Sequence, residues 1–364
     1  MESLGRLVAV FAGAAVGIWV LLAAVRTVVL PRGEPVLLTR WVFVAMRGVF
    51  NLWGKSAKTY EQRDRSLAMY APISLIALPW TWVSLVIVGF TGINWGLGVN
   101  PLREAFYLSG SSLFTLGFSV PPDLPTHFAS YVEAALGLGL IALLISYLPS
   151  IYSAFQRREL EVTRLTTRAG SPPSAITMIR RHHALNRLDA LDEIWDDWER
   201  WFADVEETHT SQPSLVFFRS ITHDRSWITS AGTVLDAAAL RSSVLNLPQN
   251  ARAQLCIRSG YLCLRRVADY FGIPHDTDPN PDDPISIDRS EFDAAYDELA
   301  DFGVPVRPQR EQCWQDFKGW RVNYDTVLLA LAGLTAAPYA PWSSDRSLRY
   351  RRPPLTRMTR GQKG

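Results

Sequence analysis

The stretch REAFYLSGSSLFTLGFSVPPDLP, Arg103 to Pro125, lies between two long apolar runs and mixes aromatic, hydroxyl and glycine residues. A connection that only links two membrane spans can be polar, and this one is not. Pro101, two residues before this stretch, can occupy a first helical turn. The first half of the stretch then predicts a mostly apolar helix of about a dozen residues, too short to cross a hydrocarbon core of about 30 Å. Thr115 to Ser119 follow without an evident helical partner for their carbonyls. Because such backbone is tolerated at membrane depth only inside protein or along a water-filled path, we expect a re-entrant helix and loop.

Three apolar runs predict membrane-spanning helices. Leu7 to Val25 and Ala71 to Phe90 are uncharged, and Phe128 to Ile151 contains one acid, Glu133. A signal peptide is the alternative for the first run, which is long for that role. The remaining chain has charges of both signs along helical patterns, as in a soluble domain.

The predicted fold class is therefore an all-α membrane protein with three transmembrane helices, a re-entrant pore helix and loop, and a cytosolic α-helical domain. We expect residues 1–70 to hold the first span and a helix at the cytosolic face, residues 71–155 the pore segment, and residues 156–364 the cytosolic domain.

Charge and cysteine content exclude several classes of protein. The net charge is +2 for 364 residues, which points neither to nucleic acid nor to an acidic partner. The three cysteines, Cys256, Cys263 and Cys313, all fall in the second half and lack zinc spacing. An odd number of cysteines fits a reducing compartment. Because zinc spacing is lacking, we expect no metal site.

The cations predict the orientation in the membrane, because Lys and Arg near span ends stay on the cytoplasmic side. The connection from Thr91 to His127 holds only Arg103. We expect a multi-pass plasma-membrane protein with its amino terminus outside and the chain after Phe155 in the cytoplasm. The connection from Leu30 to Tyr70 holds Arg32, Arg40, Arg47, Lys55, Lys58, Arg63 and Arg65.

Within that inner connection, the segment from Arg40 to Lys58 has the pattern of an amphipathic helix. Such a helix can lie flat at the inner leaflet, and packing on the soluble domain is the alternative. Its polar side contains Arg40, Arg47, Asn51, Lys55 and Lys58, opposite Trp41, Val42, Ala45, Val49, Leu52 and Trp53.

From Ala71 to about Arg158 the sequence resembles the pore module of potassium channels, in which a short pore helix precedes Thr-Val-Gly-Tyr-Gly and four such loops ring an ion path. By register, Thr115, Leu116, Gly117, Phe118 and Ser119 take the places of those five filter residues. The resemblance also places Phe106 and Tyr107 in the aromatic cuff around the filter, Ser111 and Ser112 among the supporting residues of the pore helix, and Gly137 and Gly139 at the flexible position of the inner helix.

This resemblance implies a homotetramer, because one chain supplies one loop. It also implies a permeant monovalent cation, potassium by family, and no other cofactor. The chemistry agrees: a cation that sheds water needs oxygen ligands. Thr115 offers a carbonyl and a hydroxyl, and Leu116 to Phe118 offer carbonyls. The carboxyl ends of four pore helices near Leu113 would add partial negative charge.

The segment departs from the family pattern at several positions. Ser119 replaces a glycine that permits positive φ, which costs about 1–2 kcal/mol for a residue with a Cβ, so we expect a remodelled outer end. Phe118 lacks the tyrosine hydroxyl, Val120 stands where the family has aspartate, and Phe114 stands where it repeats threonine.

Glu133 lies inside the third predicted span, where an isolated carboxylate is costly and is a functional candidate by default. It is about a turn and a half from Phe128. Pairing behind the pore helix with Ser109, Ser111 or Ser112 is therefore the alternative to a place on the ion path.

The second half predicts a helical bundle. A later helix is predicted to begin at an Asp288–Glu291 capping box and to stop at Gly303. Thr326 to Ala337 is apolar but too short to span, which predicts a buried helix. A buried seam at steps of four and three comprises Ala184, Leu188, Leu191, Trp195, Trp198, Phe202 and Val205, and we favour an intrachain core over an oligomerising coil.

Three other motifs are weak. Asp276, Asp278 and Asn280 resemble the start of a calcium loop, but Pro281 and Ile287 replace the required glycine and glutamate. His182-His183 and His223-Asp224 lack companions at metal-ligand spacing, and no phosphate loop or dinucleotide fingerprint occurs.

The sequence thus predicts a potassium-channel-like cation channel and not an enzyme. Its expected partners are itself, membrane lipid and an unknown cytosolic regulator, with no nucleic acid. The alternative is a non-conducting, membrane-anchored interaction or signalling protein that retains the pore scaffold.

Overall fold

The computed structural model describes residues 2–29, 36–54 and 59–347. Arg32, Lys55 and Lys58 of the basic connection lie outside these residues, and the side chain of Asn51 is not described. The regular structure of the described residues is helical, apart from one antiparallel bridge between Leu245 and Val306.

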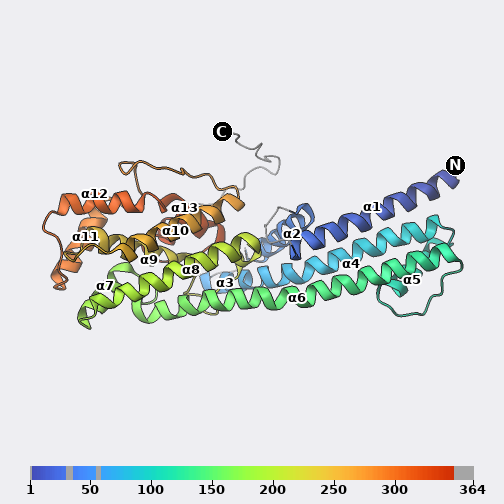
Figure 1. Cartoon of the computed structure of the whole chain (residues 1–364), viewed down its shortest axis with the longest axis horizontal. Helices are drawn as coiled ribbons and strands as arrows, with labels where there is room; N and C mark the ends of the chain where they lie inside the picture. The colour runs from blue at the N-terminus through green and yellow to red at the C-terminus, as the bar shows by residue number, and fades with distance from the viewer. Residues whose placement is uncertain (1, 30–35, 55–58, 348–364) are drawn as a thin grey trace. The chain divides into compact units, whose positions relative to one another are not determined.

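The α-helices are α1 (Glu2–Val28), α2 (Leu37–Gly54), α3 (Tyr60–Ala68), α4 (Tyr70–Gly96), α5 (Leu102–Leu113), α6 (Leu124–Ala169), α7 (Ala175–Ala184), α8 (Leu191–Ser211), α9 (Trp227–Ser243), α10 (Ala251–Tyr270), α11 (Arg289–Asp301), α12 (Arg310–Arg321) and α13 (Asp325–Thr335) (Figure 1). Three 3-10 turns are η1 (Leu188–Ala190), η2 (Pro213–Phe217) and η3 (Ser344–Arg346).

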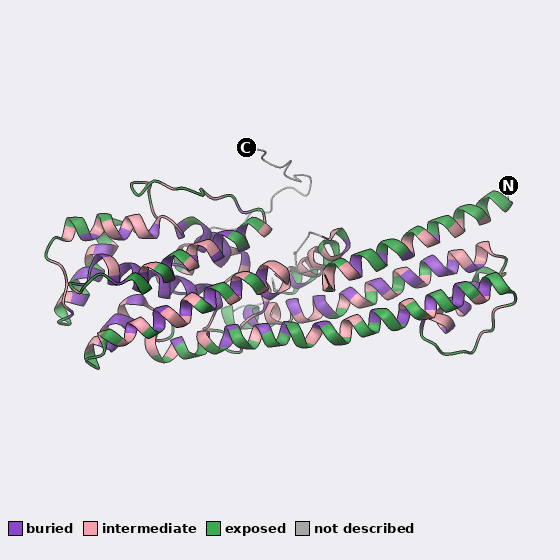
Figure 2. Ribbon diagram, in the orientation of Figure 1, coloured by how far each residue is buried: buried purple, intermediate pink, exposed green. Residues whose placement is uncertain are grey.

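The chain divides into two compact units, Met1–Ser153 and Ala154–Gly364. The first unit contains the three helices that are long and apolar enough to cross a membrane: α1, α4 with the preceding α3, and α6. Each predicted span lies within one of them. Long stretches of α1 and α6 are exposed (Figure 2). Apolar side chains such as Phe11 (67% exposed) and Ile145 (68%) are among these residues, as in lipid-facing helices.

Helix α1 packs directly against α4 through glycines. A Cβ on Gly96 would stand 2.5 Å from the carbonyl oxygen of Arg6, and one on Gly89 would stand 3.0 Å from that of Gly13. Only a residue without a side chain lets the two backbones approach so closely. The first span therefore packs beside α4 in the same chain, a point that the sequence leaves open.

Helix α4 carries no charged residue, and its side-chain hydroxyls are few. Ser74 and Thr91 bond to the backbone of their own helix: Ser74 Oγ donates to the Tyr70 carbonyl at 2.6 Å, and Thr91 Oγ1 donates to the Ile87 carbonyl at 2.7 Å. Such bonds satisfy a hydroxyl within an apolar helix.

Helix α2 corresponds to the predicted amphipathic helix, displaced toward the amino terminus by a few residues. Leu38 and Phe50 are buried inside the first unit. Trp41, Leu52 and Trp53 are 57%, 66% and 67% exposed. Most of the predicted apolar side is thus uncovered in the described chain. This exposure favours a helix that lies in the membrane interface.

In the second unit, α9 is the central helix. Nearly all of its residues are buried, and α7, α10, α12 and α13 pack around it (Figure 2). Small residues permit this packing, because a Cβ on Gly232 would stand only 2.9 Å from Leu328 Cδ2. Helix α9 is thus buried on every side, and its few charged residues bond within the unit, Asp236 to Arg321 among them.

The predicted tryptophan seam is confirmed as an intrachain core from Leu191 to Val205 on α8. Trp198 and Trp201 are 4.4 Å apart by ring centroids. Ala184 is wrongly included in that seam, because α7 ends there and its side chain is exposed. The capping box of α11 is present, and Gly303 follows with φ +85°. Helix α13 is short and buried, as predicted.

Candidate functional site

Helix α5 is a short helix packed against α4. The Pro101 carbonyl accepts from the Glu104 amide at 2.8 Å, and Glu104 supplies an acid to the first turn. Twelve residues give a length of about 18 Å, well short of a membrane span. Its buried residues are Ala105, Leu108, Ser109, Ser111 and Leu113.

The chain leaves helical geometry directly after α5. Thr115 has φ +54° and Gly117 has φ +73°. The Leu116 amide donates to the Ser111 carbonyl at 2.8 Å. Within the described residues, no hydrogen bond reaches the carbonyl oxygens of Thr115 to Phe118. These four carbonyls are therefore available to ligands from outside the chain.

The side chains of this segment are largely uncovered in the single chain. Leu116 is 62% exposed, Phe118 63% and Val120 78%. Three apolar side chains on one short turn are an unusual exposed surface unless another molecule covers them.

The sequence predicts a remodelled outer end of the segment at Ser119, and the backbone there avoids the strain of a positive φ. Ser119 is not among the residues with positive φ, and its amide donates to Ser111 Oγ at 3.2 Å. The left-handed positions are Thr115 and Gly117 instead. The departure of Ser119 from glycine is thus accommodated because the outer end of the segment takes a different backbone path.

Ser111 is the residue that braces the segment. It is 2% exposed and holds two amides of the loop, Leu116 through its carbonyl and Ser119 through its hydroxyl. Ser112 contributes its backbone, since its carbonyl accepts from the Thr115 amide at 3.0 Å.

Phe106 and Tyr107, the two aromatic residues expected to brace the filter, have no hydrogen bond to it in the described chain. Tyr107 accepts a hydrogen bond at its hydroxyl from Arg103 Nε at 2.7 Å, one turn earlier on α5. Phe106 is 50% exposed.

Glu133 lies behind α5. It is fully buried, and its Oε1 is 2.5 Å from Ser109 Oγ. The same Ser109 oxygen is 3.1 Å from the Ile87 carbonyl oxygen. Of the three serines considered from the sequence, Ser109 is the one that contacts Glu133. One hydroxyl therefore joins α6, α5 and α4.

The two glycines of the expected inner-helix hinge differ in environment. Gly137 is buried, and a Cβ there would collide with the carbonyl group of Leu113 at the end of α5. Gly139 has nothing within 4 Å of that position. It lines an apolar groove of about 420 Å³ together with Leu21, Ala135, Leu136, Leu140, Ala142, Leu143 and Ser146. Close approach to α5 is thus a sufficient reason for glycine at 137.

The other polar motifs do not form a common site. The Asp276 carboxylate accepts from the Asp278 amide at 2.9 Å, and Asn280 Oδ1 accepts from the Asp282 amide at 2.9 Å, so both serve local turns. His182 Nδ1 contacts the Met178 carbonyl. Among the described residues, no group of three or more His, Cys, Asp or Glu could hold a metal ion.

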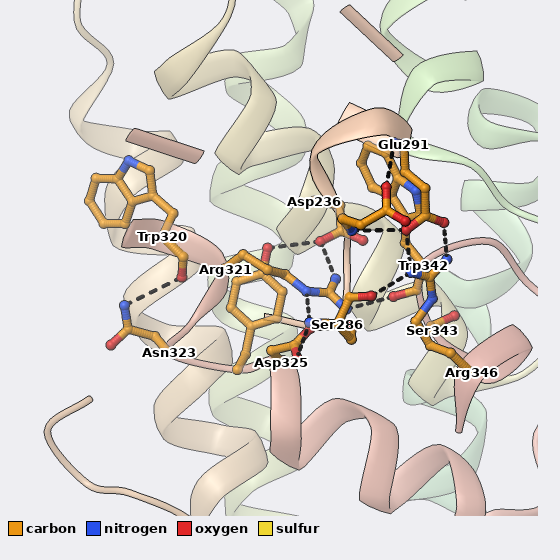
Figure 3. Close-up of polar contacts among 12 residues, drawn as sticks. Asp236, Ser286, Glu291, Trp320, Arg321, Asn323, Asp325, Trp342, Ser343 and Arg346 are labelled. Atoms are coloured by element: carbon orange, nitrogen blue, oxygen red, sulfur yellow. Dashed lines mark hydrogen bonds and ion pairs between the residues drawn. The ribbon is translucent and has the colours of Figure 1, made fainter. Parts of the chain in front are cut away.

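The second unit contains a buried ion network around Arg321 (Figure 3). Arg321 is 0% exposed, and it donates to Asp236 Oδ1 at 2.5 Å, to Asp325 Oδ1 at 2.7 Å and to the Trp342 carbonyl at 2.6 Å. Tyr324 also donates to Asp236, at 2.9 Å. The network joins α9, α12, α13 and the chain after α13.

Burial and ion pairing have opposite effects on the pKa values of Arg321 and Asp236. Burial alone lowers the pKa of Arg321, but Asp236 and Asp325 raise it above its usual value. Burial raises the pKa of Asp236, and Arg321 opposes that shift. Asp236 Oδ1 accepts hydrogen bonds from both Arg321 Nη1 and the Tyr324 hydroxyl, which favours an ionised carboxylate at this position. Each nitrogen of the Arg321 guanidinium donates to an oxygen of the same unit, and the group is 0% exposed, which indicates a structural role.

A second buried cation, Arg158, lies at the start of the second unit. It donates to the carbonyls of Leu215 (2.8 Å) and Phe218 (2.7 Å) and pairs with Glu159. Its Nη1 is 3.1 Å from His209 Nε2. Since a guanidinium can only donate, His209 must accept at Nε2 and is neutral. Burial, and then Arg158, lower the pKa of His209 well below its usual range.

Comparison of the chain with protein-family models, with curated proteins and with solved structures gives no match.

Proposed function

We propose that this chain is one subunit of a potassium-channel-like cation channel, in which four copies of the segment Thr115 to Ser119 line the ion path. The observation that carries the proposal is the set of carbonyls from Thr115 to Phe118, which have no hydrogen-bond partner among the described residues. They follow a helix too short to span and lie between two helices long enough to do so. Such carbonyls can replace the water around a monovalent cation.

Assembly into a tetramer follows from the same segment. One loop offers ligands on one side only, so a ring of loops is needed to surround an ion. The exposed Leu116, Phe118 and Val120 are apolar surface that neighbouring copies would cover. The groove beside Gly139 gives each chain a further apolar surface that lipid or a neighbouring copy would fill.

The proposed orientation places the amino terminus and the loop 114–123 outside the cell. The second unit, which would assemble or gate the tetramer, lies in the cytoplasm, and the membrane is the plasma membrane. The support is the distribution of cations, with Arg103 alone between α4 and α6 and many Lys and Arg residues before α4.

The test is cation flux through the purified protein in liposomes loaded with potassium. We expect a potassium leak in the wild type that Gly117→Val abolishes. Gly117 has φ +73° with nothing within 4 Å, so valine changes the backbone and the width of the path.

Gly98→Val is the matched control. Gly98 also has a positive φ, +118°, and open space around it, but it lies in the connection between α4 and α5. It should keep the flux. Both variants should assemble to four times the monomer mass of 40.8 kDa. A wild-type tetramer without flux would favour the non-conducting alternative instead, and a monomer would contradict the tetrameric channel.

A further inference from the structure

The contact between Ser109 and Glu133 fixes where a proton must lie. Ser109 Oγ is within hydrogen-bond distance of two oxygens, Glu133 Oε1 at 2.5 Å and the Ile87 carbonyl at 3.1 Å. A serine hydroxyl carries one proton and can donate only one hydrogen bond of normal geometry. The Ile87 carbonyl can only accept. Both contacts are hydrogen bonds only if the carboxyl group of Glu133 carries a proton and donates it to Ser109.

The surroundings of Glu133 do not supply a counter-charge. Within the described residues no Lys, Arg or His forms an ion pair with it, and it has 0% exposure. A carboxylate buried without a cation or several donors is strongly disfavoured relative to the neutral acid.

The titratable groups on the helices packed around Glu133 are few and lie away from it. Helix α4 carries none except Tyr70, at its opposite end, where the hydroxyl donates to the Phe43 carbonyl. On α5, Arg103 bonds with Tyr107, and Glu104 is exposed in the first turn. On α6, the earlier turns hold His127 and Tyr131, whose rings pair with each other at 6.2 Å.

The other carboxyl oxygen, Glu133 Oε2, is a buried polar atom without a hydrogen-bond partner among the described residues, and so is Ser130 Oγ. Glu133 and Ser130 lie one turn apart on α6. Buried polar atoms of this kind usually bind an ordered water molecule.

We infer that Glu133 is a proton-binding site behind the pore helix, whose occupancy decides how α5 is held. With the proton bound, Glu133 donates to Ser109 and Ser109 donates to Ile87, so α6, α5 and α4 are tied together. Loss of the proton leaves a carboxylate, and the Ser109 hydroxyl then turns to it and gives up its bond to the Ile87 carbonyl, which keeps its bond from Thr91 Oγ1. Its effect on flux rests on the proposed channel function, whereas the protonation itself does not.

Infrared difference spectroscopy of the full chain in liposomes tests the protonation directly. Wild type minus Glu133→Gln should show the carbonyl band of a neutral carboxylic acid at pH 7. Glutamine keeps the shape and can donate to Ser109 through its amide. Ser109→Ala should keep the band but shift it to higher frequency, because that hydrogen bond is lost. If the difference spectrum contains only carboxylate bands at pH 7, the inference is overturned, whether or not the protein conducts.

Flux tests the coupling separately. Raising the pH until the acid band disappears should reduce potassium flux in the wild type, whereas flux through Glu133→Gln should not change over the same range. Equal pH responses of the two proteins would overturn the coupling. Absence of flux from the wild type at every pH would instead count against the channel function, with the infrared result unaffected.

Discussion

Gly137 of α6 lies against the carbonyl group of Leu113, the last residue of α5, with the Leu113 carbonyl carbon 3.2 Å from the place where a Cβ would be. This contact positions the end of the short helix from which the loop emerges. Gly137 and Gly139 of α6 therefore differ in environment, because a Cβ on Gly139 would meet nothing within 4 Å.

Gly137→Ala and Gly139→Ala should therefore have opposite effects on stability. Alanine in a helix interior is favoured over glycine by about 1 kcal/mol, so Gly139→Ala should raise the melting temperature or leave it unchanged. Gly137→Ala should lower it, because the methyl group pushes α5 away. Thermal unfolding in detergent, followed by helical circular dichroism, gives both values. Equal shifts would show that Leu113 and Gly137 are not in contact.

Arg321→Met should destabilise the second unit by about 3–5 kcal/mol, because Asp236 and Asp325 would remain buried without their cation. The measurement is the free energy of unfolding from denaturant titration.

The matched control for that variant is Arg252→Met. Arg252 is 54% exposed and pairs with Asp196 at 3.0 Å. An exposed pair of this kind contributes about 1 kcal/mol or less. A loss at Arg321 no greater than that at Arg252 would mean that the network is not closed in solution.

The second unit should lose stability as the pH falls below about 6.5, the ordinary pKa of histidine. The pKa of His209 is lowered in the folded chain, so between the two values the unfolded state binds more protons. The stability is complete above pH 6.5 and falls by up to about 1.4 kcal/mol per pH unit below it. Unfolding titrations between pH 7 and pH 5 measure this slope.

His209→Gln keeps an acceptor for Arg158 and does not titrate, so its slope in that range should be flat. The carboxylates with lowered pKa, such as Asp224 and Glu311, act only nearer pH 4 and do not interfere. A slope that persists in His209→Gln would assign the acid sensitivity to another group.

Cysteine labelling should reveal the orientation. The native thiols of Cys256, Cys263 and Cys313 are buried, and burial raises the pKa of each, so they should not react with a membrane-impermeant maleimide. Val120→Cys should be labelled in intact cells. Ile221→Cys, at a position that is 93% exposed in the second unit, should be labelled only after the membrane is opened. The reverse pattern would invert the proposed topology.

The sequence predicts those features that depend on local pattern. The apolar runs predict α1, α4 and α6, the capping box predicts α11, and the spacing of tryptophans predicts the core face of α8. Helix α9 carries no such signal. It is buried on all sides, and its small and polar residues are spread around the helix, so no amphipathic periodicity predicts it.

The site is predicted less completely because its details are set by packing between segments. The choice of Ser109 among three serines depends on the rotation of α5 against α6. The potassium-channel pattern suggests a positive φ at position 119, but the structure has it at Thr115. This difference depends on how Ser111 holds the loop. Likewise, the pattern of small residues in α6 does not distinguish Gly137, which contacts α5, from Gly139, which lines a groove.

Thr115 is β-branched and yet adopts φ +54°, a conformation that glycine reaches without penalty and that costs other residues about 1–2 kcal/mol. Its hydroxyl makes only a local bond, to the carbonyl of Phe114 at 2.7 Å, which does not explain the choice. Folding alone would be better served by a residue without a side chain. The proposed channel would give this threonine a use, because its carbonyl and hydroxyl would then both be ligands on the ion path.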